Sequence, residues 1–370
     1  ELTGASAANY TLSFDSSEPL HSEVVGDNAG FNVQTSAEIT RAELAIWTGK
    51  GSTSNWFDQQ NWADGVIPDR ANVSRVEIGE GVEVTFNEDS LSGTAVDGLV
   101  ELDALTFTNN DEDTPLSESR FNITHGSLAV SGDAALGGLE MASGTSLDID
   151  GTLSVDIVDH GTNGEVAGKI SGDGNIVKAG AGTLAMSGEN TYGGGTIVNA
   201  GVLKAGVGTT IESSDASISK GPFGRGAVSL SDGAELDVNG YSIDNSLSLS
   251  GTGISGSALT NSTNTAVILG GDLTLGATTT MKSVGKLTLD GDLSTADPSS
   301  PLALNFIGGG DVVIGAAQTL VSDTTLDNDG GALTLNRPVN ADNTASSTAL
   351  TLAGDGGVFL NASIGGHKAV

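Results

Sequence analysis

The chain has 370 residues, and its 14 Lys and Arg against 47 Asp and Glu give a formal net charge of −33 at pH 7. This balance excludes nucleic-acid binding, which needs a basic surface to pair with phosphates. The complete absence of cysteine excludes disulfides, thiolate metal sites and cysteine nucleophiles. The 54 glycines show no three-residue period, so the chain is not collagen-like.

The first 46 residues differ from the rest because they lack the Gly-Asp-Gly clusters that recur later. Apolar alternation predicts strands at 10–14, 37–40 and 44–46. We therefore place a module boundary at residues 46 and 47.

The next segment, 47–80, contains all three tryptophans of the chain, Trp47, Trp56 and Trp62. One interpretation is an aromatic cap that covers the open apolar end of the solenoid predicted to follow, because a solenoid must hide its first coil. The other is a carbohydrate-stacking platform, in which Trp56 and Trp62 would bind glycans.

Residues 81–370 show apolar alternation with period two and almost no helical periodicity. Short strands recur between glycine- and aspartate-rich turns, and the inward positions are aliphatic with few aromatics, which favours stacked coils over an antiparallel sandwich. The predicted fold class is therefore all-β, a right-handed parallel β-helix. Roughly 20 residues per coil predict a rod on the order of 75 Å long. The clearest inward pairs are Val228/Leu230, Leu247/Leu249, Leu273/Leu275, Leu287/Leu289, Leu302/Leu304, Val312/Ile314, Leu333/Leu335 and Leu350/Leu352.

One stretch inside this region, 172–203, has the sequence GDGNIVKAGAGTLAMSGENTYGGGTIVNAGVL. Gly180, Gly182 and Gly188 flank a short strand at 183–187, so we expect two sharp turns in which these glycines adopt positive φ. The stretch closely resembles the autotransporter-associated β-strand repeat, with GxGxLxKxGxGTLxLSGxNTYxGGTxIxxGxL as its pattern. Met186 in place of Leu and Gly193 in place of Ser or Thr are mild departures.

The flanking segments are similar to the same class of bacterial exoproteins. Trp47-Thr48-Gly49, the Asn-Trp pairs at 55–56 and 61–62, and Pro68 resemble the segment that opens such β-helical regions. Residues 1–46 look like the C-terminal part of the small β-sandwich modules of filamentous-haemagglutinin-like proteins. The resemblance implies a secreted or cell-surface adhesin-type protein of a Gram-negative bacterium, exported through an outer-membrane β-barrel translocator.

The sequence offers no recognisable catalytic constellation. The four histidines, His21, His125, His160 and His367, lack the spacing of a metal-binding motif, and no GxSxG elbow or P-loop is present. We therefore predict a structural and adhesive segment, a rigid stalk that supports adhesion or self-assembly into extracellular filaments or matrix, and not an enzyme. Its expected partners are other copies, neighbouring modules of a longer chain, and surface glycans or receptors. The alternatives are a glycan-binding module and a polysaccharide-degrading β-helix enzyme.

Compact groups of oxygen ligands in predicted turns make Ca²⁺ the candidate cofactor. Asp327 and Asp329 form one candidate metal site, and Asp111 and Asp113 form another. The competing interpretation is that these aspartates are solvated turn residues, because none completes an EF-hand loop.

We expect the melting temperature to rise with calcium or ionic strength, because a charge of −33 on a thin rod repels itself and cations relieve that repulsion. Thermal melting in EDTA and in millimolar calcium at constant ionic strength measures the specific part of the effect. Equal melting temperatures in the two buffers would argue against a specific calcium site.

Overall fold

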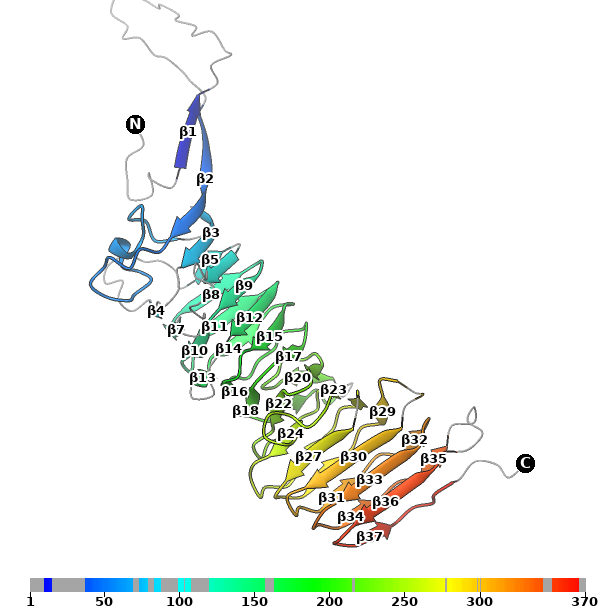
Figure 1. The fold of residues 1–370 in the computed structure, drawn as a ribbon. Helices are drawn as coiled ribbons and strands as arrows, with labels where there is room; N and C mark the ends of the chain where they lie inside the picture. Colours follow the sequence, from blue (N-terminus) through cyan, green and yellow to red (C-terminus); the bar gives the residue numbers. More distant parts are fainter. Residues whose placement is uncertain are drawn as a thin grey trace, which may run out of the picture.

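The structure is a computed structural model that describes residues 10–14, 37–68, 73–78, 83–87, 99–102, 104–107, 120–156, 163–214, 217–276, 278–297, 299, 301–341 and 348–365. In these residues the chain forms an elongated rod of stacked β-strands, and one short 3-10 helix, η2 (Gln59–Asn61), lies near one end. Figure 1 shows the β1–β2 hairpin at one end of the rod and β36 and β37 at the other. The predicted parallel β-helix is confirmed.

The first sheet has 12 strands and extends from the N-terminal hairpin to β29. In spatial order it consists of β1 (Tyr10–Phe14), β2 (Ala37–Ile46), β3 (Val73–Ile78), β6 (Ala104–Phe107), β9 (Ala134–Leu136), β12 (Thr152–Asp156), β15 (Asn175–Ala179), β17 (Thr196–Val198), β21 (Val228–Leu230), β23 (Leu247–Leu249), β26 (Leu273–Leu275) and β29 (Leu293–Thr295).

The second sheet also has 12 strands, so at about 4.8 Å between neighbouring strands it is about 50 Å long. The solenoid is shorter than we expected because its coils contain more residues than the assumed 20. The sheet consists of β4 (Glu83–Asn87), β7 (Arg120–His125), β10 (Gly138–Met141), β13 (Asn163–Val166), β16 (Thr183–Met186), β18 (Val202–Ala205), β22 (Glu235–Asp237), β24 (Leu259–Asn261), β27 (Thr279–Ser283), β30 (Leu302–Ile307), β33 (Thr324–Asn328) and β36 (Leu350–Gly354).

A third face is built in two separate parts, of four and five strands. The first part is β5 (Leu99–Leu102), β8 (Ser127–Val130), β11 (Ser146–Ile149) and β14 (Lys169–Ser171). The second part is β25 (Val267–Leu269), β28 (Leu287–Leu289), β31 (Val312–Ile314), β34 (Leu333–Leu335) and β37 (Val358–Leu360). Two small pairs complete the described strands, β19 (Thr210–Ile211) with β20 (Ile218–Lys220) and β32 (Gln318–Leu320) with β35 (Val339–Ala341).

The core is a set of aliphatic columns that follow from the alternation of each strand. Leu287, Val312 and Leu333 occupy equivalent positions in successive coils, pair in parallel register, and are each at most 1% exposed. Inward side chains therefore pack on their counterparts in the coils above and below. The same stacking buries apolar surface and forms the main-chain hydrogen bonds between coils.

The first sheet joins the β1–β2 hairpin to the solenoid. β2 pairs with β1 antiparallel on one side and with β3 in parallel on the other, so the first sheet continues from the hairpin into the coils. The two strands expected at 37–40 and 44–46 are one ten-residue strand, β2.

The three tryptophans form an aromatic cluster inside the first coils. Trp56 is fully buried, its ring centroid lies 4.8 Å from that of Trp62, and the Trp62 Nε1–H donates to the Trp56 carbonyl at 2.8 Å. Trp47 packs edge-on against Trp62 at 5.0 Å, and Phe86 and Phe121 extend the contact to Trp56. Edge-to-face packing of this kind adds to the apolar burial of the first coils, and the role of this cluster as a cap stays a prediction.

The autotransporter-like repeat lies where the third face is interrupted, between β14 and β25. Here buried side chains replace the missing strands. The Asn190 Oδ1 accepts from the Ile170 N–H at 2.7 Å, and its Nδ2 donates to the Pro222 carbonyl at 2.7 Å, so one amide connects three coils. The buried Tyr192 hydroxyl lies 2.6 Å from the Thr196 hydroxyl.

A lysine occupies one inward position of the same repeat. Lys178 is 0% exposed, pairs in register with Val155 and Val198, and its ammonium donates to the carbonyls of Ala179 and Gly180 at 2.6 and 2.7 Å. A third hydrogen bond, 3.0 Å long, reaches the Ala200 carbonyl in the next coil. Burial lowers the pKa of Lys178 to about 8, and the nearby Asp156 carboxylate opposes this shift.

Glycine is required at positions 180 and 188 of the repeat for different reasons. Gly180 has φ 68°, as expected for a sharp turn. The expectation of positive φ is wrong for Gly182 and Gly188, which lack it. At Gly188 a Cβ would overlap the Gly168 carbonyl oxygen of the preceding coil. Close approach between coils, and not backbone conformation, requires glycine at this position.

Replacing Trp56 by alanine should lower the free energy of unfolding of the first coils by about 3–5 kcal/mol, because it opens a large cavity in the aromatic cluster. Urea unfolding followed by the fluorescence of the two remaining tryptophans measures this, since Trp47 and Trp62 lie in the same cluster. Phe359→Ala is the matched control, because Phe359 is 54% exposed and its loss should cost less than about 0.5 kcal/mol. Equal effects of the two substitutions would contradict the assignment of the cap.

The free energy of unfolding should increase as the pH rises from about 8 toward 9.5. In this range the Lys178 side chain is neutral in the folded chain but still protonated in the unfolded chain. In that interval the unfolded chain binds the extra proton, so raising the pH favours folding. Lys178→Met should remove this increase, whereas Lys169→Met, at an exposed position of β14, should leave it intact. Chemical denaturation of the three proteins across this range measures the slope, and a slope unchanged in Lys178→Met would refute the account.

Candidate functional site

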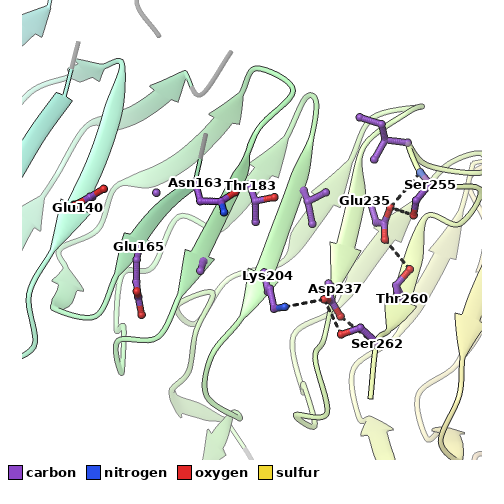
Figure 2. A pocket seen from close by; sticks show the side chains of 14 residues that line it. Glu140, Asn163, Glu165, Thr183, Lys204, Glu235, Asp237, Ser255, Thr260 and Ser262 are labelled. Carbon is purple, nitrogen blue, oxygen red and sulfur yellow. Dashed lines mark hydrogen bonds and ion pairs between the residues drawn. The ribbon is translucent and has the colours of Figure 1, made fainter. Parts of the chain in front are cut away.

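A groove of about 660 Å³ lies on the outward face of the second sheet. It crosses β10, β13, β16, β18, β22 and β24, and Figure 2 shows its side chains following one another across these strands. Its lining is mostly polar side chains, and it includes Glu140, Asn163, Glu165, Thr183, Glu235 and Asp237.

Alternation within each strand and parallel register between strands bring these side chains together. In β22 the central Leu236 is buried in the core, so Glu235 and Asp237 on either side of it project from the opposite face of the sheet. Asp237 is in register with Lys204, which is in register with Ala185. Residues about 20 to 30 positions apart in the chain thus form one continuous row.

Glu235 is held at the closed end of the groove by hydroxyl groups. Its carboxylate accepts from the Thr260 hydroxyl at 2.7 Å and from the Ser255 hydroxyl, and the Ser255 N–H also points to it at 3.3 Å. The Ser257 hydroxyl lies 2.7 Å from that of Thr260. The loop that carries Ser255 and Ser257 therefore covers Glu235 and satisfies its oxygens, which leaves it 5% exposed.

Asp237 is held in the same way, with one cation added. Its carboxylate accepts from the Ser262 hydroxyl at 2.9 Å and the Asn239 N–H at 2.8 Å, and it lies 3.5 Å from the Lys204 ammonium. The Lys204 side chain is 37% exposed, so this ion pair adds little stability by itself. Its effect is to fix the position of both side chains in the wall of the groove.

The other half of the groove is open and carries exposed acceptors. Glu140 pairs with Arg120 at 2.9 Å, and Glu165 accepts from the Ser187 hydroxyl at 3.3 Å. Thr183 and Ala185 form part of the floor between them and the closed end. At one end of the groove the carboxylates are therefore fixed by hydrogen bonds to the protein. At the other end they are exposed to solvent and can bind a ligand.

A second hollow, of about 600 Å³, lies farther along the same sheet. Asp327, at an outward position of β33, and Asp329, in the following turn, both line it together with Asp355 and Asn305. Even so, in the part of the chain that the structure describes no group of three or more His, Asp or Glu is arranged to hold a metal ion. The calcium site stays a prediction for Asp327 and Asp329, and Asp111 and Asp113 lie outside the described residues.

The structure places the two candidate glycan-stacking residues in the core. Trp56 is 0% and Trp62 3% exposed, and both rings pack in the aromatic cluster. Neither ring has a free face for a sugar in this arrangement. The open groove on the second sheet, which contains no aromatic side chain among its lining residues, is the surface that sequence reasoning missed. The outward residues that flank each inward pair, such as Glu235 and Asp237 around Leu236, were the available signal.

The chain was compared with protein families, with curated proteins and with solved structures. The model of the passenger-associated-transport-repeat family matches residues 176–205. A stretch of 138 residues, 36% of this chain, is 37% identical to the "Adhesin BmaC autotransporter" of Brucella suis biovar 1 (strain 1330). The chain covers 3% of the length of that relative. No solved structure matches.

Among the described residues no helix is long and apolar enough to span a membrane. The family match lies on the strands and turns from β15 to β18, where the buried Lys178 and Asn190 organise the interrupted third face. The repeat, the parallel solenoid and the similarity to an autotransporter adhesin agree with one another. The chain therefore carries a passenger-associated transport repeat and is similar over about a third of its length to an autotransporter adhesin.

Proposed function

We propose that this chain is a rigid, non-catalytic segment of a cell-surface adhesin of a Gram-negative bacterium, carried to the surface through an outer-membrane translocator. The observation that supports this most strongly is the unbroken second sheet of 12 strands in a chain with the passenger repeat. A stack of this kind is stiff along its axis, because each coil is fixed to its neighbours by both main-chain ladders and side-chain columns. It would hold adhesive surfaces away from the cell.

Export suits the composition as well as the fold. A chain without cysteine forms no crosslink before it crosses a pore, and a solenoid folds coil by coil from local contacts. Each coil that forms outside the membrane offers its edge to the next one, so folding can proceed as the chain emerges.

Assembly with other copies is the second part of the proposal, and stacking of equivalent coils is the geometry it would use. Val358, Phe359 and Leu360 of β37 are 37%, 54% and 52% exposed. Leu333 and Leu335, which pair with Val358 and Leu360 one coil earlier, are at most 1% exposed. Val358 and Leu360 thus continue the inward columns of the preceding coil, and an added layer of β-structure would bury them in the same way.

Display of the chain on a non-adherent Gram-negative host, fused to an outer-membrane translocator, tests the proposal. Antibody should label the chain on intact cells, and the cells should gain binding to epithelial or abiotic surfaces. Leu203→Asp, which places a charge at a fully buried position, should reduce both signals at least several-fold because it breaks one coil. Ile197→Asp, at a 41% exposed position of β17, is the matched control and should leave them unchanged.

Sedimentation velocity of the purified chain, run beside the display experiment, measures self-association. Cells that carry the labelled chain but gain no adhesion would contradict the adhesive role. Strictly monomeric sedimentation at all concentrations would contradict assembly, without affecting adhesion.

A further inference from the structure

The groove on the second sheet has the dimensions of a site for an extended polymer. It crosses six neighbouring strands, which at about 4.8 Å per strand gives a length of about 25 Å. The outward residues are smallest in the middle of the groove, at Thr183 and Ala185, and Figure 2 shows larger side chains on either side of Thr183. A compact small molecule would contact only a fraction of such a groove, whereas a linear chain would contact all of it.

The side chains that line the groove suit a ligand rich in hydroxyl groups. Sugar hydroxyls donate as well as accept, and the exposed carboxylates of Glu140 and Glu165 and the amide of Asn163 offer acceptors and donors along the open half. At the closed end Glu235 and Asp237 are already saturated by protein donors, so they fix the shape of the wall instead of competing for the ligand. A wall that is rigid before binding lowers the entropic cost of binding.

The charge of the groove decides between classes of polymer. Four carboxylates, those of Glu140, Glu165, Glu235 and Asp237, line it. Two cations oppose them, the Lys204 ammonium and the Arg120 guanidinium that pairs with Glu140, so acidic groups stay in excess. The chain as a whole carries a net charge of −33. Polymers of uronic acids, sulfated glycans and sialylated glycans would be repelled, whereas neutral or amino sugars would not.

The same geometry disfavours a peptide. An extended peptide usually binds by adding to a free strand edge, but the groove lies on a sheet face, where the main-chain groups of β13, β16 and β18 are paired with neighbouring strands. The lining also exposes apolar surface, to which Val202 and Ile254 contribute. A sugar chain, with hydroxyl groups and short C–H faces, matches this mixture better.

We propose that this groove binds a linear glycan without acidic groups, in contact with the outward side chains of β13, β16 and β18. The inference rests on the proposed surface location, because it requires the groove to meet polysaccharide outside the cell. It assigns to the groove the contact that the buried tryptophans do not provide.

Isothermal titration of the purified full chain with cellohexaose, chitohexaose and hexagalacturonic acid tests this assignment. We expect binding of at least one of the first two and none of the third. Ala185→Arg, which fills the floor, should weaken that binding at least tenfold. Ala135→Arg places the same side chain at an outward position of β9 in the first sheet and should leave binding unchanged, with circular dichroism confirming that both variants fold.

Each other outcome overturns the assignment. Absence of binding to both cellohexaose and chitohexaose, preferential binding of hexagalacturonic acid, or equal behaviour of the two variants would show that the groove is not a site for a non-acidic glycan. Binding of an extended peptide in the groove, displaced by no sugar, would do the same. If cells that display the chain still adhere in any of these cases, only the groove assignment fails and the adhesive function stands.

Discussion

The whole architecture depends on one constraint, that each coil must present the same inward side chains in the same register as the coil beneath it. Parallel pairing keeps equivalent residues about 4.8 Å apart, so an aliphatic side chain such as Leu287 packs on a counterpart of similar shape, Val312, in the next coil. A displacement by a single residue would turn every core side chain outward. Burial and main-chain pairing therefore enforce each other along the rod.

The polar groups in the interior lie where this regularity is interrupted. Between β14 and β25 none of the described strands belongs to the third face, and there Lys178 and Asn190 bind carbonyl and amide groups of adjacent coils. Such buried polar groups add little net stability, but an incorrect register would leave them without partners. The passenger repeat thus combines a glycine-rich turn with side chains that specify which coil lies above which.

The same stacking of coils also produces the groove on the outer face of the second sheet. The inward columns require alternation, and alternation leaves a parallel set of outward rows whose chemistry is free to vary. Across β10 to β24 these rows carry carboxylates, hydroxyls and an amide, and the loop containing Ser255 closes one end over Glu235. A surface for a polymer therefore needs no separate domain, because the solenoid already aligns one side chain per coil.

The sequence by itself determined the strands and the fold class. Pairs such as Leu273/Leu275 and Leu333/Leu335 coincide with β26 and β34, because alternation and turn residues act within a few positions of one another. It also identified the repeat, whose pattern is local. Only the tertiary structure decided that Trp56 is buried, that Gly188 is needed for contact with Gly168, and that Glu235 and Asp237 meet Ser255 and Ser262. Those contacts join residues about 20 positions apart, in neighbouring coils. Their spacing depends on the number of residues in each coil, and that number varies along the chain, so local sequence patterns do not predict which residues meet.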